Sequence, residues 1–215
     1  YTIGDQGNQQ FSNACVPIQS QTLPTAQDVA QKNYFPYQGK SLRINLDGSV
    51  PDDNPVLNGV QSHVFTYGHR NMQGLAFAPD GRLYGSEHGP KSDDEVNILK
   101  AGANYGWPHI SGFVDDLAYQ NASWPEAPNC ETLGFSDLQL PAAVPVEKET
   151  DWSGTSEDPL ATLFTVPSDW NFADPQCDGM YFICWPTVAP SSLEYYSARA
   201  GGIPGWENAL LVPTL

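Results

Sequence analysis

Short apolar runs separated by tight turns make up most of the chain. In the range 41–50, "SLRINLDGSV", apolar and polar residues alternate up to an Asp-Gly pair, and in 75–87, "LAFAPDGRLYGSE", Pro-Asp-Gly stands between two apolar runs. Alternation with a period of two is typical of a strand with one buried face, and Asp-Gly favours a hairpin turn. Both ranges therefore predict β-hairpins.

Further apolar segments bounded by Pro, Gly or Ser occupy 160–168, 179–188 and 207–215. The range 25–33, "TAQDVAQKN", is the single helical candidate, and it is short. Nineteen Gly and nineteen Pro fit many turns and few helices. Repeated hairpins without long helices predict an all-β fold and favour a β-propeller over a sandwich. At roughly 40 to 50 residues per blade, the chain would supply about four to five blades.

Composition narrows the range of partners. The chain has 215 residues with 25 Asp and Glu against 9 Lys and Arg, which gives a net charge of −16. A polyanion would be repelled, so the charge argues against nucleic acid and anionic membrane surfaces as partners. The apolar fraction of 40% indicates a folded protein, and no run approaches the roughly 20 apolar residues of a membrane span. Carboxylates among backbone carbonyls are compatible with calcium.

Four cysteines, at positions 15, 130, 177 and 184, lack the C-x2-C spacing of a zinc site. Cys177 and Cys184 flank "DGMYFI", a pattern that predicts a turn entering a strand. A local disulfide between them is favoured over two reduced thiols if the compartment is oxidising. Asn121 begins the sequon Asn-Ala-Ser, which has meaning only in a eukaryotic secretory pathway.

Both ends of the chain lie in apolar segments that read as strands, "YTI" at the start and "ENALLVPTL" at the end. Natural domains rarely begin or stop inside an element. We therefore expect residues 1–215 to be part of a single β-propeller domain that is truncated at both ends.

Polar residues collect at two predicted strand ends. Arg70 and Asn71 lie in "YGHRN", and Gly89 and Pro90 lie in "SEHGP". An Arg side chain presents a planar fork suited to a carboxylate, while a Gly-Pro pair offers carbonyl oxygens that can coordinate a hard cation. The pattern predicts one loop that binds an anion and a neighbouring loop that binds its metal.

Six blocks of the chain resemble, in the same order, the soluble quinoprotein glucose dehydrogenases within the glucose and sorbosone dehydrogenase family. The most specific is 68–108, "GHRNMQGLAFAPDGRLYGSEHGPKSDDEVNILKAGANYGWP", and the others are 1–9, 39–55, 144–154, 174–192 and 205–213. The resemblance covers nearly the whole chain and is weakest over 117–143. It implies a six-bladed catalytic propeller that binds pyrroloquinoline quinone (PQQ) and calcium.

The resemblance also implies the reaction. An aldose such as glucose is oxidised at its anomeric carbon to the lactone, and the electrons leave to an external acceptor. The cofactor carries the redox step and the protein supplies position and charge. Export to the periplasm or outside the cell, and a homodimer in the full-length protein, are further implications.

The resemblance also implies roles for individual residues of this chain, by their positions in the matching blocks. Those matching cofactor contacts are Arg70, Asn71, Gln73, His88, Trp185 and Thr187, and those matching substrate contacts are Gln10, Phe11 and Phe182. Asp5 matches the carboxylate that orients the catalytic histidine. That histidine matches a position before Tyr1, and the basic groups that hold the quinone carboxylates match positions after Leu215, so we expect the chain alone to be inactive.

Three calcium sites are implied. Gly89 and Pro90 match carbonyl ligands of the catalytic ion, which acts as a Lewis acid. The residues that match two further sites are Glu95 and Tyr105 for one, and Ser111, Phe113, Asp115 and Glu149 for the other. Asp93 and Asp94 are acids near these expected ligands. The alternative for both is that they are solvated residues of a turn.

Some positions depart from the family pattern. His88 stands in place of Gln, Phe182 in place of Tyr and Met72 in place of Pro, which affects the expected sugar preference more than the fold.

Taken singly, these residues would have ordinary structural roles. Arg70 would be a surface ion-pair residue, Gly89-Pro90 a plain turn, and His69 and His88 hydrogen-bonded loop residues. Two other functions stay open. One is a non-catalytic propeller module that binds carbohydrate or protein. The other is a calcium-dependent lactone hydrolase, which would need a carboxylate-rich metal where this chain has carbonyls.

Overall fold

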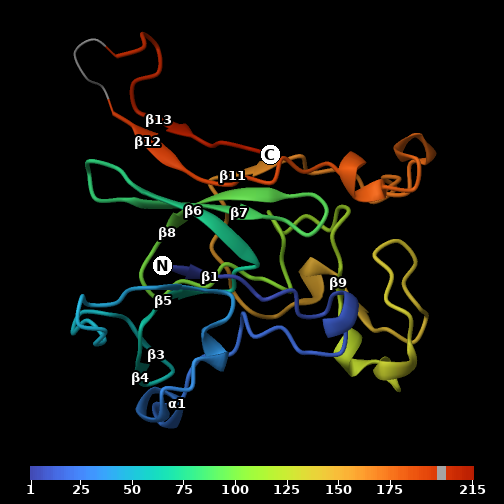
Figure 1. The fold of residues 1–215 in the computed structure, drawn as a ribbon, viewed down its shortest axis with the longest axis horizontal. Helices are drawn as coiled ribbons and strands as arrows, with labels where there is room; N and C mark the ends of the chain where they lie inside the picture. The colour runs from blue at the N-terminus through green and yellow to red at the C-terminus, as the bar shows by residue number, and fades with distance from the viewer. Residues whose placement is uncertain (198–201) are drawn as a thin grey trace.

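A computed structural model describes residues 1–197 and 202–215 as an assembly of small antiparallel sheets (Figure 1). In these ranges no helix is long and apolar enough to cross a membrane. The all-β prediction is confirmed.

The largest sheet has four strands in the order β11-β8-β7-β6, all antiparallel. Its strands are β6 (Asn71–Phe77), β7 (Leu83–His88), β8 (Asp94–Leu99) and β11 (Ala161–Leu163). The turn between β6 and β7 closes through the Ala78 N–H donating to Arg82 and the Gly81 N–H donating to Ala78, with Gly81 at φ 88°. The hairpin predicted over 75–87 is therefore confirmed.

A three-stranded sheet, β1-β2-β5, consists of β1 (Thr2–Ile3), β2 (Lys40–Leu42) and β5 (Val64–Tyr67). The strand expected to continue from β2 to the Asp-Gly pair ends at Leu42, so that part of the prediction is wrong. The Asp47 carboxylate accepts hydrogen bonds from the backbone and hydroxyl of Ser49, and Leu46 is fully exposed. A local turn replaces the strand, because the backbone groups of Asn45 bond to Ser49 and Gly48 instead of to a neighbouring strand.

The remaining strands form three two-stranded ribbons. They are β3 (Val56–Leu57) with β4 (Val60–Gln61), β9 (Asn121–Ala122) with β10 (Val146–Glu147), and β12 (Glu194–Tyr196) with β13 (Ala209–Leu211). Helix α1 (Ala26–Gln31) begins at Thr25 with a capping box to Asp28 and ends at Lys32 in the left-handed conformation, as the range 25–33 predicts.

Seven single 3-10 turns complete the described structure. Their bounds are Phe11–Asn13, Phe35–Tyr37, Trp124–Glu126, Cys130–Thr132, Glu149–Asp151, Pro175–Cys177 and Tyr181–Cys184. The last two replace the strand predicted after Cys177, because "DPQCDGMYFIC" closes on itself through local i to i+3 hydrogen bonds. The same segment contains the Cys177–Cys184 disulfide. A second disulfide joins Cys15 to Cys130.

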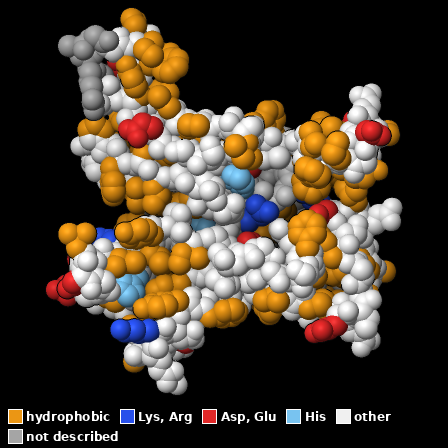
Figure 2. Space-filling view, in the orientation of Figure 1, with side chains coloured by type: hydrophobic (Ala, Val, Ile, Leu, Met, Phe, Trp, Pro, Cys, Tyr) orange, Lys and Arg blue, Asp and Glu red, His pale blue; other side chains and the backbone are white. Residues whose placement is uncertain are grey.

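Apolar packing joins the sheets in sequence order. Met72, Leu99 and Tyr105 pack with Phe65, between the three-stranded and the four-stranded sheets. On the other side, a cluster of Ala76, Ala78, Tyr84 and Leu193 contacts residues of β12 and β13. Figure 2 shows further hydrophobic side chains exposed along the outer parts of the molecule. Successive small sheets packed face to face are blades, which confirms the partial β-propeller.

Candidate functional site

Two loops meet at one end of the four-stranded sheet. Arg70 lies between β5 and β6, and Gly89 directly follows β7. Asn71 pairs with His88 in the β6–β7 register, so the two loops are neighbours. The structure thus brings together the loops that the sequence analysis assigned to an anion and to its metal.

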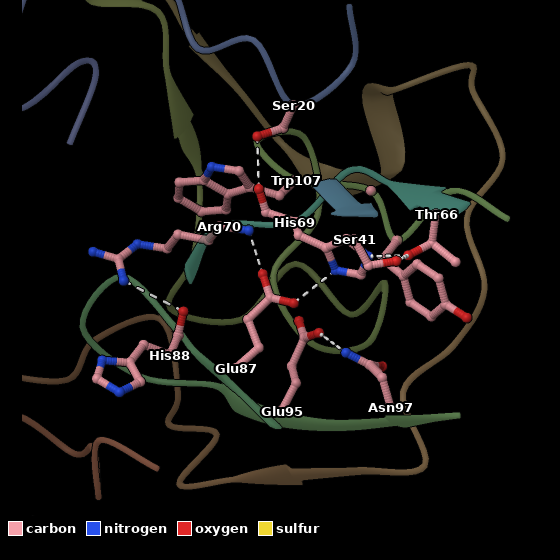
Figure 3. A network of polar contacts seen from close by, with 12 residues as sticks. Ser20, Ser41, Thr66, His69, Arg70, Glu87, His88, Glu95, Asn97 and Trp107 are labelled. Carbon is pink, nitrogen blue, oxygen red and sulfur yellow. Dashed lines mark hydrogen bonds and ion pairs between the residues drawn. The ribbon is translucent and has the colours of Figure 1, made fainter. Parts of the chain in front are cut away.

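The Arg70 side chain has unused hydrogen-bonding capacity. Its Nη1 donates to the His88 carbonyl oxygen at 3.3 Å, and its guanidinium carbon lies 5.7 Å from the centre of the Trp107 ring (Figure 3). Its Nε is buried and has no hydrogen-bond partner among the described residues. A partly buried cation with a free, buried donor is suited to an anionic or carbonyl ligand.

Asp5 lies beside Arg70. Its backbone N–H donates to the Arg70 carbonyl oxygen at 2.7 Å, and its carboxylate accepts from the Gly7 N–H and the Trp107 Nε1–H, each at 3.0 Å. Burial raises the pKa of this carboxyl, while the charge of Arg70 opposes that rise. Asp5 is therefore a fixed and partly desolvated acid.

A cavity of about 240 Å³ opens between these two residues. The residues that line it are Gly4, Asp5, Gln6, Gly7, Gln10, Arg70 and Asn71. Gly4 has no room for a larger side chain, because an added Cβ would lie 3.0 Å from Asn71 Oδ1 and 3.3 Å from the Arg70 carbonyl oxygen. Three predicted site residues, Gln10, Arg70 and Asn71, thus line one space with Asp5.

A second cavity of about 260 Å³ shares Gln10 with the first. Pro90, Trp107 and Tyr119 also line it, with further aromatic and amide side chains. Aromatic faces combined with amide groups can bind a polar ring such as a sugar.

Behind Arg70 lies a buried polar network that the sequence analysis did not identify (Figure 3). One Glu87 oxygen accepts the backbone N–H of Arg70, and the other lies 2.8 Å from His69 Nδ1. His69 Nε2 lies 2.8 Å from Thr66 Oγ1, which contacts Ser41. Both ring nitrogens of His69 thus have hydrogen-bond partners inside the protein. This agrees with the hydrogen-bonded structural role that the sequence analysis gave as the ordinary one for His69.

Asp94 is a second missed residue. It is fully buried, not a solvated turn residue, and it accepts four hydrogen bonds. One comes from Gly89, and the others come from Thr187, Val188 and Ala189. Asp93 is buried as well. No local pattern distinguishes these two acids from exposed ones.

Several predicted site residues line neither cavity. Phe182 is 63% exposed, Trp185 donates to the Phe172 carbonyl oxygen at 3.2 Å, and Gln73 donates to Asn71 at 2.8 Å. Phe11 is 70% exposed and packs against Phe135. Their assignments stay predictions.

The two residues expected at the second calcium site, Glu95 and Tyr105, are both buried. Glu95 accepts from the Gly112 N–H at 2.6 Å and from Asn97 at 2.8 Å. Burial, together with the neighbouring Glu87, raises the pKa of Glu95 to about 8. The Tyr105 ring stacks on His69 with centroids 4.7 Å apart, and burial raises the pKa of its hydroxyl to about 12. A cation beside Glu95 and Glu87 would offset the cost of burying two carboxyl groups.

At the third expected site, Glu149 organises a loop. Its carboxylate accepts the backbone N–H groups of Ser111, Asp115 and Asp116 at 3.0 to 3.2 Å. Burial raises its pKa. Phe113 and the Asp115 side chain are exposed. In 1–197 and 202–215, no three His, Cys, Asp or Glu side chains form a group that could hold a metal ion.

Comparison with known proteins places this site in a family. The family model described as Glucose / Sorbosone dehydrogenase matches residues 2–132, which include both loops. The chain belongs to the glucose/sorbosone dehydrogenase family. Over its whole length it is 51% identical to quinoprotein glucose dehydrogenase B of Acinetobacter calcoaceticus, of which it covers 46%.

Other sugar dehydrogenases are similar to part or most of the chain. An aldose sugar dehydrogenase of Escherichia coli is 44% identical over 48% of the chain, which covers 27% of that protein. A crystal structure of a glucose dehydrogenase superposes with a TM-score of 0.50, at 26% identity, over 91% of this chain and 42% of that one. The chain spans about half or less of the length of these relatives.

Proposed function

We propose that this chain provides part of a PQQ-dependent sugar dehydrogenase that oxidises an aldose at the anomeric carbon to the lactone. The observation that carries the proposal is the pairing of a buried, unpartnered Arg70 Nε with a fixed Asp5 on one cavity. Similarity to a quinoprotein glucose dehydrogenase supports it. The physiological acceptor of the electrons would be an external one.

The residues present fit a bound quinone and a calcium ion. Arg70 offers donors to a quinone oxygen or carboxylate, and Asn71 lines the same space. The Gly89 and Pro90 carbonyl oxygens accept no hydrogen bond from residues 1–197 or 202–215, so they could serve as ligands of a hard cation. When bound, the quinone supplies hydride acceptance and the calcium ion supplies Lewis acidity.

The chain's own groups would bind and orient the sugar. Gln10 lines both cavities and can hydrogen-bond sugar hydroxyl groups from either side. The Asp5 carboxylate would hold the imidazole of a histidine from outside this chain, so that the histidine can remove the proton of the anomeric hydroxyl. Trp107 fixes the Asp5 carboxylate through its indole N–H.

Location outside the cytoplasm belongs to the same proposal. All four cysteines are paired in two disulfides, which persist in oxidising compartments. A homodimer remains a prediction.

The test is a titration of the protein, produced from its complete reading frame, with PQQ in the presence of calcium. We expect saturable binding followed by absorbance, and calcium-dependent aldose oxidation with an artificial electron acceptor. Arg70→Ala should weaken quinone binding by at least about tenfold, since a charge-assisted contact contributes roughly 1.5–3 kcal/mol. Arg82→Ala, at an exposed ion pair with Asp80, is the matched control.

Binding of sugar without oxidation in the presence of both cofactors would favour the non-catalytic module. Lactone hydrolysis without quinone would favour the hydrolase.

A further inference from the structure

The Asp94 carboxylate joins two loops that are far apart in sequence. Its Oδ1 accepts the Gly89 N–H at 2.9 Å. Its Oδ2 accepts the Thr187 hydroxyl at 2.6 Å and the N–H groups of Val188 and Ala189 at 2.7 and 3.1 Å. The side chain is completely buried. A buried carboxylate with four donors on it is strongly held and has one orientation.

The contact to Gly89 fixes a particular peptide. The His88–Gly89 peptide donates its N–H to Asp94, and its carbonyl oxygen accepts from Arg70 Nη1 at 3.3 Å. Gly89 is tightly packed, because an added Cβ would lie 1.8 Å from the Ser92 carbonyl oxygen. The plane of this peptide is therefore set from both sides, which restrains the start of the Gly89-Pro90 segment that carries the two carbonyl oxygens.

We propose that Asp94 is a positioning residue that fixes the Gly89-Pro90 carbonyls and the 187–189 backbone in one arrangement for metal and cofactor. This inference rests on the proposed function. Asp94 touches neither ligand in the proposal. It acts through Gly89 on the cation and through Thr187 on the quinone.

The hydrogen-bond pattern predicts how each substitution acts. Every partner of Asp94 is a donor, so an Asn side chain can satisfy only one side with its oxygen. With that oxygen on the three-donor side, the amide NH₂ of Asp94→Asn faces the Gly89 N–H and releases it. Thr187→Val removes one donor from the opposite side and leaves the Gly89 contact in place.

The experiment compares these two variants with the control Asp93→Asn. Asp93 is also buried, but its carboxylate accepts from the hydroxyls of Ser92 and Thr165 and makes no hydrogen bond to the Gly89 N–H or to the 187–189 backbone. Calcium affinity is measured by calorimetry on the quinone-free protein. PQQ affinity and the absorption spectrum of the bound quinone are then measured at saturating calcium. Circular dichroism and thermal unfolding check each fold.

We expect Asp94→Asn to weaken calcium binding by about 10- to 100-fold, as is typical of groups that hold metal ligands in place. Thr187→Val should change quinone affinity and spectrum more than calcium affinity, and Asp93→Asn should change neither. A folded Asp94→Asn protein with unchanged calcium affinity overturns the inference and leaves the proposed function intact. If Asp94→Asn does not fold, Thr187→Val decides, and equal effects on both ligands overturn the inference. If the unsubstituted protein binds neither ligand, the proposed function fails and the inference fails with it.

Discussion

The indole Nε1 of Trp107 donates a 3.0 Å hydrogen bond to Asp5 Oδ2 across 102 residues of sequence. The same indole ring lies 5.7 Å from the Arg70 guanidinium carbon. The Trp107 side chain therefore contacts both the Asp5 carboxylate and the Arg70 guanidinium of the smaller cavity. It fixes the carboxylate that the proposed mechanism uses.

Trp107→Phe should shift the pH dependence of sugar oxidation. The indole bond lowers the pKa of Asp5, which burial raises, so its loss should raise that pKa further. If the ionised carboxylate is the active form, the acidic limb of the kcat profile should move to higher pH. Trp152→Phe, whose ring stacks on His109 and lines neither cavity, is the control. An unchanged acidic limb would show that this bond does not influence catalysis.

The Cys15–Cys130 disulfide should contribute more stability than Cys177–Cys184. It closes a separation of 115 residues against 7. Loop-closure entropy predicts losses of about 5 and about 2 kcal/mol in the free energy of unfolding when the respective pair is replaced by Ser. Denaturant titration of the two double variants measures both losses. A larger loss for the 7-residue pair would contradict the prediction.

Lys40 should make stability depend on pH. Its Nζ donates to the carbonyl oxygens of Gln19, Ser20 and Gln38 at 2.7 to 2.9 Å, and burial lowers its pKa from 10.5 to about 7. Between these two values the unfolded chain binds a proton that the folded protein lacks, so the free energy of unfolding should rise with pH.

The rise is at most about 1.4 kcal/mol per pH unit. Lys40→Met should lack this part of the slope when both proteins are unfolded by denaturant at pH 7, 8 and 9. Equal slopes would show that Lys40 keeps its ordinary pKa.

The sequon at Asn121 should carry no glycan in the folded protein. Asn121 is 4% exposed and pairs with Glu147 in the β9–β10 ribbon, so its side-chain amide is not accessible from the outer surface of the folded protein. Mass spectrometry of protein secreted from a eukaryotic host should find Asn121 unmodified, and Ser123→Ala should not change the glycan content. A glycan on Asn121 in folded protein would refute this.

Local signals determined what the sequence could predict. The β6–β7 hairpin follows from Pro-Asp-Gly between apolar runs, and α1 follows from its capping residues. Asp94 with Thr187, and Cys15 with Cys130, join segments about 90 to 115 residues apart, and no local pattern encodes such pairs. The strand expected after Leu42 is a turn instead, because alternation alone does not show whether a neighbouring strand is available, and the backbone groups of Asn45 bond to Ser49 and Gly48.

The same distinction between local signals and long-range contacts applies to the site. Neighbouring strand ends brought the loops of Arg70 and Gly89 together, which the sequence indicated through motif spacing and family resemblance. Glu87 in β7 and Asp94 at the start of β8 are buried by segments distant in sequence, and the residues next to them in sequence do not indicate whether these acids are covered.

The position of β11 in the four-stranded sheet has a consequence for synthesis on the ribosome. β11 covers the outer edge of β8, yet it is translated about 60 residues later. During that interval the edge of β8 is open to pairing with other nascent chains. Asp94 and Glu95 at the start of β8, preceded by Asp93, place negative charge on this edge and would repel an identical edge on a neighbouring chain.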